Sequence, residues 1–171
     1  MKRISCLFVV AVVTSWGISH SVQGQELVQN GDFSNNTTGT TTYNMTNNEF
    51  TSIVAFCRGF GTAQEIDLIY DSDNGPPPLV GNTKLRIHRQ QNGGYDAFST
   101  TLLSPVVAAS SYRLQVDVVS RVNLETDLQV GISSSSSSFG TLLQSVPAVA
   151  NTWTSIDVIV SAPVGGGYLT F

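Results

Sequence analysis

The regular alternation of apolar and polar side chains is the feature that most constrains how this chain folds. Between Ser111 and Val119, apolar residues alternate with polar ones: Tyr112, Leu114, Val116 and Val118 against Arg113, Gln115 and Asp117. Successive side chains of a β-strand point to opposite faces, so the pattern predicts a strand with one buried and one solvated face. Shorter patterns of this kind occur at Asp127–Ile132 and Thr154–Val160. Because no useful length of sequence shows a helical period, we expect an all-β protein.

Weaker strand patterns and turn residues fill most of the remaining sequence. We expect further strands at Glu26–Gln29, Ser52–Phe56, Glu65–Ile69, Lys84–His88, Asp96–Leu102 and Tyr168–Phe171. Turns are predicted where glycine, proline and asparagine gather, at Asn74–Pro78, Gly81–Asn82, Asn92–Gly94, Ser104–Pro105 and Gly165–Gly167. The Asn- and Thr-rich segment Asn35–Asn48 and the serine run Ser133–Ser138 are expected to be surface loops. Many short strands separated by turns indicate a sandwich or a barrel.

The first 24 residues have the pattern of a secretory signal peptide. Lys2 and Arg3 precede the apolar run Ile4–Ile18, and Val22–Gly24 offers small residues at a cleavage site before Gln25. The apolar run is short for a membrane span. We therefore predict a secreted or cell-surface protein whose folded domain comprises residues 25–171, without membrane insertion after processing. The alternative is an N-terminal anchor that is never cleaved.

The charge balance excludes some classes of partner. The chain has twelve acidic residues against eight basic ones, and two of those eight, Lys2 and Arg3, lie in the predicted leader. Nucleic acids and anionic membranes are bound through basic patches, so we expect neither as a partner.

Cysteine chemistry is limited to one residue after processing. Cys57 cannot form an internal disulfide, and its neighbours Phe56 and Phe60 favour a buried, inert thiol. We find no motif of a nucleophile elbow, a zinc protease or a phosphate loop. We therefore expect no catalytic residues and a protein that is not an enzyme.

Five segments of the chain carry a family pattern: the opening Gln25–Phe33, the hairpin segments Leu102–Val106 and Ser111–Val116, the tryptophan-led Asn151–Thr154, and Gly167–Phe171. In this order they resemble the galactose-binding-like jelly-roll domains found as carbohydrate-binding modules in secreted bacterial proteins. The resemblance covers nearly all of residues 25–171, and it implies an antiparallel jelly-roll β-sandwich. Members of the family usually close with one more strand, so we expect a C-terminally truncated jelly roll that lacks its final strand. A truncated domain is also expected to be attached to further domains in the full product.

A calcium site is one interpretation of the acidic residues near the middle of the chain. Glu65, Asp67, Asp71 and Asp73 lie within nine residues, and hard cations prefer such oxygen ligands. Asp71 and Asp73 are the candidate ligands of a structural calcium ion, which the family resemblance also implies. However, the spacing does not match an EF-hand loop, and Ser34 replaces a glutamate that the family usually has. The alternative is a solvated acidic loop.

Sugar binding requires an aromatic ring that faces apolar C–H groups and planar polar groups that bind hydroxyls. By alternation, Arg86 and His88 face outward from one strand, Gln115 faces outward from another, and Tyr70 and Tyr95 lie in nearby loops. If the two strands are neighbours, these five residues line a groove for a polysaccharide. The alternative is that they are ordinary solvent-facing residues, with the tyrosines in the core or at its rim.

The resemblance implies non-catalytic carbohydrate binding as an accessory module of a larger secreted or surface protein. The second hypothesis is a structural or adhesive extracellular domain that keeps the sandwich but has no sugar site. Because jelly rolls host many functions, the fold does not decide between the two.

Overall fold

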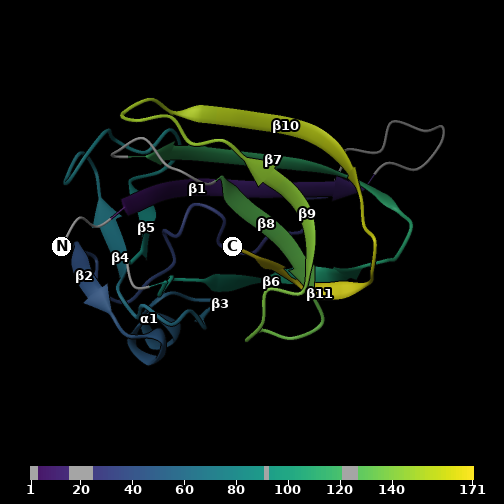
Figure 1. Cartoon of the computed structure of the whole chain (residues 1–171), viewed down its shortest axis with the longest axis horizontal. Coiled ribbons are helices and arrows are strands. Elements are labelled where there is room, and N and C mark those ends of the chain that lie inside the picture. Colours follow the sequence, from purple (N-terminus) through teal and green to yellow (C-terminus); the bar gives the residue numbers. More distant parts are fainter. Residues whose placement is uncertain (1–3, 16–24, 91–92, 121–126) are drawn as a thin grey trace.

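The computed structural model describes residues 4–15, 25–90, 93–120 and 127–171, the first of these ranges by its backbone alone. Within these residues the chain forms two antiparallel sheets that enclose one apolar core (Figure 1). The predicted all-β class is confirmed, and the architecture is that of a β-sandwich. No described helix is long and apolar enough to span a membrane.

The two sheets contain all of the described strands. The six-stranded sheet has the order β10 (Thr154–Ser161), β7 (Ser111–Ser120), β1 (Ile4–Ser15), β5 (Thr83–Arg89), β4 (Ile66–Tyr70), β2 (Thr42–Met45). The five-stranded sheet has the order β3 (Cys57–Gly59), β6 (Phe98–Val106), β11 (Gly166–Thr170), β8 (Leu128–Ser133), β9 (Thr141–Val146). A single described helix, α1 (Asn47–Ile53), follows β2.

The alternating patterns correspond to real strands with one core-facing side. Leu114, Val116 and Val118 of β7 are buried in the core that the two sheets share, as are Leu85 of β5 and Ile132 of β8. The patterns at β4, β6, β10 and β11 are also confirmed, with ends shifted by a few residues. The sequence pattern alone therefore predicted seven of the described strands.

The strand predicted at Ser52–Phe56 is wrong, because Ser52 and Ile53 end helix α1 and the residues after them form an isolated bridge and a turn. Thr46 caps the helix: its hydroxyl accepts a hydrogen bond from the Glu49 N–H at 3.3 Å, and the Glu49 carboxylate accepts one from the Thr46 N–H at 2.8 Å. This capping box satisfies N–H groups that a short helix leaves open at its start. The expected loop Asn35–Asn48 accordingly contains β2 and the beginning of α1.

Other differences concern short or irregular strands. The segment Glu26–Gln29 pairs with the second sheet only through an isolated bridge between Val28 and Leu102. The turn expected at Ser104–Pro105 lies inside the end of β6, and β3 and β9 had no strong pattern. β1 lies within the predicted leader, and removal of that leader stays a prediction.

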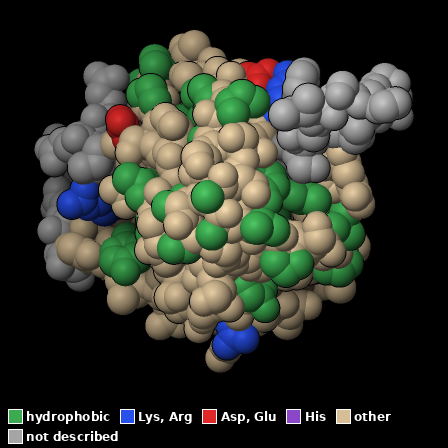
Figure 2. Space-filling model, turned by 90° about the vertical axis from the view of Figure 1, so that its right-hand side faces the viewer, with side chains coloured by type: hydrophobic (Ala, Val, Ile, Leu, Met, Phe, Trp, Pro, Cys, Tyr) green, Lys and Arg blue, Asp and Glu red, His purple; other side chains and the backbone are tan. Residues whose placement is uncertain are grey.

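One end of the sandwich is poor in charge. Figure 2 shows this end, with apolar side chains scattered among polar and backbone atoms and few charged groups. Val107 and Val164, from the loops at this end, are exposed. Beneath them a small apolar pocket between the sheets is lined by Leu102, Val106, Tyr112, Ile132, Leu143, Val160, Ala162 and Leu169. Scattered single apolar residues are normal on a protein surface, so this end by itself indicates no function.

Candidate functional site

A cluster of polar side chains lies on the outer face of the six-stranded sheet, where β4 and β5 pair. Asp67 of β4 lies directly opposite Arg86 of β5, and neither residue exposes more than 7% of its surface. Arg86 donates hydrogen bonds to the Oδ2 atom of Asp67 through Nε and Nη2. His88 places its Nε2 atom 3.1 Å from the same oxygen. The dielectric constant is low around a buried carboxylate, which strengthens its hydrogen bonds and ion pairs. Asp67 therefore holds its partners in fixed positions.

Tyr43 covers this cluster, and a bulge in β2 places it there. Asn44 adopts a left-handed backbone conformation with φ of 54°, which asparagine tolerates better than most residues. The register of β2 against β4 shifts at this point, and the Asn44 N–H donates to the Oδ1 atom of Asp67 at 2.6 Å. Met45 consequently enters the core, while Tyr43 remains 43% exposed.

Two contacts fix the Tyr43 ring in place. The guanidinium carbon of Arg86 lies 5.6 Å from the ring centroid, a cation–π arrangement. The Tyr43 hydroxyl donates to the Oδ2 atom of Asp73 at 2.9 Å. The pKa of Tyr43 is raised by partial burial and by this bond to Asp73. The result is an exposed aromatic ring held in one orientation beside an exposed carboxylate.

Lys84 places a positive charge beneath the loop that contains Asp71 and Asp73. Its side chain is buried on the outer face of β5, and its Nζ atom donates to the carbonyl oxygens of Asp71 at 3.2 Å and Pro76 at 2.6 Å. Burial lowers the pKa of Lys84 to about 8. The Lys84 ammonium thus occupies carbonyl oxygens of the kind that a calcium ion would need.

This geometry gives no support to calcium binding at Asp71 and Asp73. Calcium takes six to eight oxygen ligands, and within the described part of the chain no three His, Cys, Asp or Glu side chains are grouped to share an ion. Asp73 already accepts the Tyr43 hydroxyl, and the buried Lys84 charge repels a cation. The loop residues therefore do not fit a calcium ion.

Lys84 makes the stability of the protein depend on pH in a defined direction. The folded state releases the Lys84 proton near pH 8, whereas the unfolded chain retains it up to about 10.5. Because the unfolded state then binds more protons, the free energy of unfolding contributed by this group rises between pH 8 and pH 10.5. We expect the urea midpoint of the wild type to rise over this window relative to that of Lys84→Met. Parallel curves for the two proteins would contradict the assignment.

The structure brings some of the predicted sugar-site residues together but buries them. Arg86 and His88 share Asp67, and their burial differs from the solvated face expected from alternation. Tyr70 is half-buried, and its hydroxyl donates to the Oδ1 atom of Asn36 at 2.8 Å. Tyr95 is 51% exposed and lies beyond the end of β5, where it forms a bridge with Arg89.

Gln115 lies apart from the other predicted site residues. β5 and β7 are not neighbours, because β1 pairs with both of them. Along β1, Arg86 is opposite Leu7 and Gln115 is opposite Val12. Five residues of strand correspond to roughly 17 Å. The structure therefore does not form the single groove expected from these residues.

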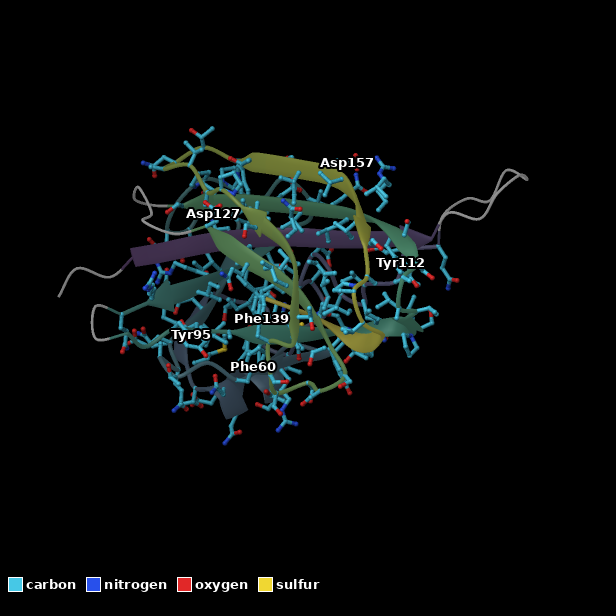
Figure 3. The ribbon with its side chains drawn as sticks, turned by 45° about the vertical axis from the view of Figure 1, so that its right-hand side comes forward. Phe60, Tyr95, Tyr112, Asp127, Phe139 and Asp157 are labelled. Carbon is cyan, nitrogen blue, oxygen red and sulfur yellow. The ribbon has the colours of Figure 1, made fainter. Side chains whose placement is uncertain are left out.

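Gln115 belongs instead to an exposed ion-pair cluster between β7 and β10. Its Nε2 atom donates to Asp157 at 3.3 Å, and Asp157 also accepts two hydrogen bonds from Arg113. Arg113 lowers the pKa of Asp157 through these bonds. In Figure 3, Asp157 and Tyr95 lie on opposite sides of the molecule.

Two residues of the cluster were missed as site residues by sequence reasoning. Tyr43 lies in the Asn- and Thr-rich segment that was expected to be a loop, and Asp67 was seen only as one of four acids. The available signal for Asp67 was its position between the apolar residues Ile66 and Leu68, which places its carboxylate on the outer face of the strand. There it lies opposite Arg86 of the neighbouring strand. No local pattern identifies Tyr43.

Cys57 is buried, as its aromatic neighbours suggested. Burial raises the pKa of its thiol to about 12, although a hydrogen bond with Thr100 acts in the opposite direction. The thiolate, which is the nucleophilic form of cysteine, is therefore disfavoured at neutral pH.

No protein-family model, curated protein or solved structure matches this chain. The geometry of the outer face is thus the basis for assigning a function.

Proposed function

We propose that the protein is a non-catalytic carbohydrate-binding module of a secreted or cell-surface protein. The sequence resemblance to galactose-binding-like jelly rolls supports this proposal, and a β-sandwich is the architecture that the resemblance implies. A module of this kind acts passively: by holding a polysaccharide, it raises the local concentration experienced by an attached domain.

The observation that carries the proposal is the Tyr43 ring. Sugars stack their C–H faces on exposed aromatic rings that need little reordering on binding. One side of Tyr43 contacts Arg86, its hydroxyl is bound by Asp73, and the rest of the side chain reaches solvent. This arrangement is a preorganised stacking surface.

Polar groups beside the ring supply partners for sugar hydroxyls. Asn44, the next residue in the chain, and Asp73, which accepts the tyrosine hydroxyl, are both exposed, and Asn74 also contacts that hydroxyl. Carboxylate and amide groups accept and donate the hydrogen bonds that sugar hydroxyls need. Arg86 and His88 lie beneath and hold Asp67, which accepts the Asn44 N–H.

A glycan array followed by substitution tests this assignment. We expect the folded protein to retain a subset of polysaccharides, and we expect Tyr43→Ala to weaken that retention by about tenfold, which corresponds to roughly 1.4 kcal/mol. Phe56→Ala is the matched control, because Phe56 is an aromatic residue of similar exposure, 49%, that is bonded through its carbonyl to the other sheet.

Other outcomes of this experiment have clear meanings. Loss of binding in Tyr95→Ala with full binding in Tyr43→Ala would move the site to the far end of β5. Equal loss in Tyr43→Ala and Phe56→Ala would show that neither ring is a specific platform.

The second candidate function is that of a structural or adhesive domain. The burial of Arg86 and His88 favours it, because their contacts with Asp67 are those of a stabilising cluster. A blank array from a correctly folded sample supports this second candidate.

A further inference from the structure

The outer edge of β10 is the longest open strand edge in the described part of the molecule. Among the described strands, β10 pairs with β7 alone, over eight residues in unbroken register (Figure 1). The other edge strands are shorter or irregular: β2 has four residues and a register shift, β3 has three, and β9 has six and a register shift. Short strands and bulges keep an edge from pairing with other chains. β10 has neither form of protection.

β10 also lacks the residues that commonly protect an edge. Its sequence contains no lysine, arginine or proline, and its one charged residue, Asp157, is bonded to Arg113 of β7. Ile159 lies on the outer face and exposes 64% of its surface, more than any other large apolar residue that the structure describes. A long, regular edge that carries an exposed apolar side chain favours pairing with another strand.

Alternate residues of β10 direct their backbone groups toward the open edge. The N–H of Ala162, just after the strand, donates to the Ser110 carbonyl at 3.0 Å, and the Ala162 carbonyl accepts from the Ala109 N–H at 2.8 Å. Both partners lie just before β7, so Ala162 points its backbone groups toward β7. Because these groups alternate in direction along a strand, the odd-numbered residues of β10 point theirs away from β7. The residues with backbone groups at the open edge are therefore Ser155, Asp157, Ile159 and Ser161.

We propose that this edge binds the same edge of a second copy of the chain, so that two β10 strands pair antiparallel about a two-fold axis at Ile159. In this register Ile159 lies against Ile159 of the second copy on the outer face. Asp157 lies opposite Ser161 of the second copy, whose hydroxyl donates to the carboxylate. Each of these pairs exchanges backbone hydrogen bonds, which provide the affinity when a strand is added to a sheet edge.

The charge of Asp157 selects this register over its neighbours. A two-fold axis at Asp157 would place two carboxylates directly opposite each other, which is destabilising in a sheet. An axis at Val158 would place each carboxylate against an isoleucine side chain, where it would lose water without gaining a hydrogen bond. With the axis at Ile159, the carboxylate keeps Arg113 of its own chain and gains a hydroxyl from the second copy.

The same register extends the apolar core across the contact. Ile156 and Val158 pack against the core from β10 but remain only partly buried. In the proposed pair, Val158 lies opposite Val160 of the second copy, and Ile156 lies opposite Ala162 of the second copy. These contacts remove further apolar surface from water. Both faces of β10 are thus complementary to themselves, which is why the occupant is a second copy.

This inference goes beyond sugar binding and does not depend on it. Tyr43 belongs to β2, at the opposite edge of the six-stranded sheet. The inference is also independent of leader removal, because β10 contacts β7 on the side away from β1.

Sedimentation equilibrium over a range of protein concentrations tests the association. We expect the mass of the purified protein to rise from that of one chain toward that of two. Ile159→Glu is expected to weaken dimerisation by about tenfold or more, because two carboxylates would lie directly opposite each other at the axis. Within its own chain the substituted residue lies opposite Arg113, so the fold is expected to tolerate it, and an unchanged melting curve checks this.

The matched control is Leu142→Glu. Leu142 lies in the edge strand β9 of the other sheet and is 47% exposed, so the substitution places the same charge on a different edge. We expect this variant to dimerise like the wild type.

Cysteine cross-linking tests the register. Residues of a hydrogen-bonded antiparallel pair have Cα atoms about 5.5 Å apart, within the range that a disulfide spans. We expect Ile159→Cys to form a disulfide-linked dimer on air oxidation. Ser155→Cys is the control on the same face of the same strand, because the two copies of residue 155 lie near opposite ends of the paired strands. Cys57 is buried and is not expected to react.

Three results would overturn the proposal. One is the mass of a single chain at every concentration up to about 1 mM. Another is dimerisation that is lost in Leu142→Glu and kept in Ile159→Glu, which would place the contact at the β9 edge. The third is equal cross-linking of Ile159→Cys and Ser155→Cys, which would show that the strands do not pair about Ile159. A blank glycan array leaves all of these readouts unchanged, so failure of the proposed function is distinguishable from failure of this inference.

Discussion

Replacement of Asp67 with alanine is expected to lower the free energy of unfolding by about 3–5 kcal/mol, because it leaves the Arg86 charge buried without its carboxylate. Arg86 exposes 7% of its surface and directs two nitrogen atoms to Asp67. The same substitution removes the acceptor of the Asn44 N–H. Urea denaturation followed by circular dichroism measures the loss.

The chain contains a matched control for this prediction. Arg113 and Asp157 also form an arginine–aspartate pair across neighbouring antiparallel strands, but their side chains are 41% and 47% exposed. Solvent and salt screen such a pair. We expect Asp157→Ala to leave the urea midpoint almost unchanged. Equal effects of Asp67→Ala and Asp157→Ala would contradict the buried ion pair.

Asp67→Asn and a double-mutant cycle separate charge from hydrogen bonding. Asparagine keeps an oxygen for the Asn44 N–H but loses the negative charge, so an intermediate loss is expected. In the double variant Asp67→Ala with Arg86→Ala, the loss is expected to be smaller than the sum of the single losses, because no unpaired charge remains. Additive losses would show that the two residues act independently.

The sequence predicted the strands best where one face is buried and the other is not. β7 is the clearest case, since Tyr112 to Val118 alternate strictly between core and outer face. β9 escaped detection because it is an edge strand whose residues are mostly half-buried or exposed, which removes the contrast on which alternation depends.

At helix α1, the sequence pattern predicted the wrong kind of element. A weak pattern predicted a strand at Ser52–Phe56, although Thr46 and Glu49, six and three residues before Ser52, have the spacing of a capping box. With only one buried side chain, Phe50, the helix has too short an apolar stripe to display a period. The local start signal was therefore more informative than the periodicity.

Alternation also predicted which face each candidate residue occupies, but not what lies next to it. Arg86 and His88 do share the outer face of β5. Arg86 is covered by the Tyr43 ring, which the pairing of β2 with β4 brings there. The separation of Gln115 depends on which strand lies between β5 and β7. Both are long-range facts that no local sequence pattern contains.

Replacement of Phe98 with alanine is the second large effect, with an expected loss of about 3–5 kcal/mol in the free energy of unfolding. Phe98 is fully buried and contacts three aromatic rings. Its centroid lies 5.9 Å from that of Phe33, 5.8 Å from that of Phe50 and 4.8 Å from that of Phe171. These rings come from the first segment after the predicted leader, from α1 and from the residue that follows β11.

The size of this loss reflects how many separate segments Phe98 joins. Core substitutions are most costly where neighbours cannot collapse into the space left behind. The neighbours of Phe98 are constrained: Phe171 by paired backbone hydrogen bonds with residue 98 itself, and Phe50 by the capped helix. Phe98→Leu retains part of the volume, so its loss is expected to be clearly smaller.

Comparison with an exposed phenylalanine makes the prediction specific to packing. Phe56→Ala removes the same side chain from a position that is 49% exposed, and its urea midpoint is expected to change little. The three variants should therefore rank in stability as Phe56→Ala, Phe98→Leu and Phe98→Ala, from highest to lowest. A loss in Phe98→Ala no larger than that in Phe56→Ala would contradict the packing argument.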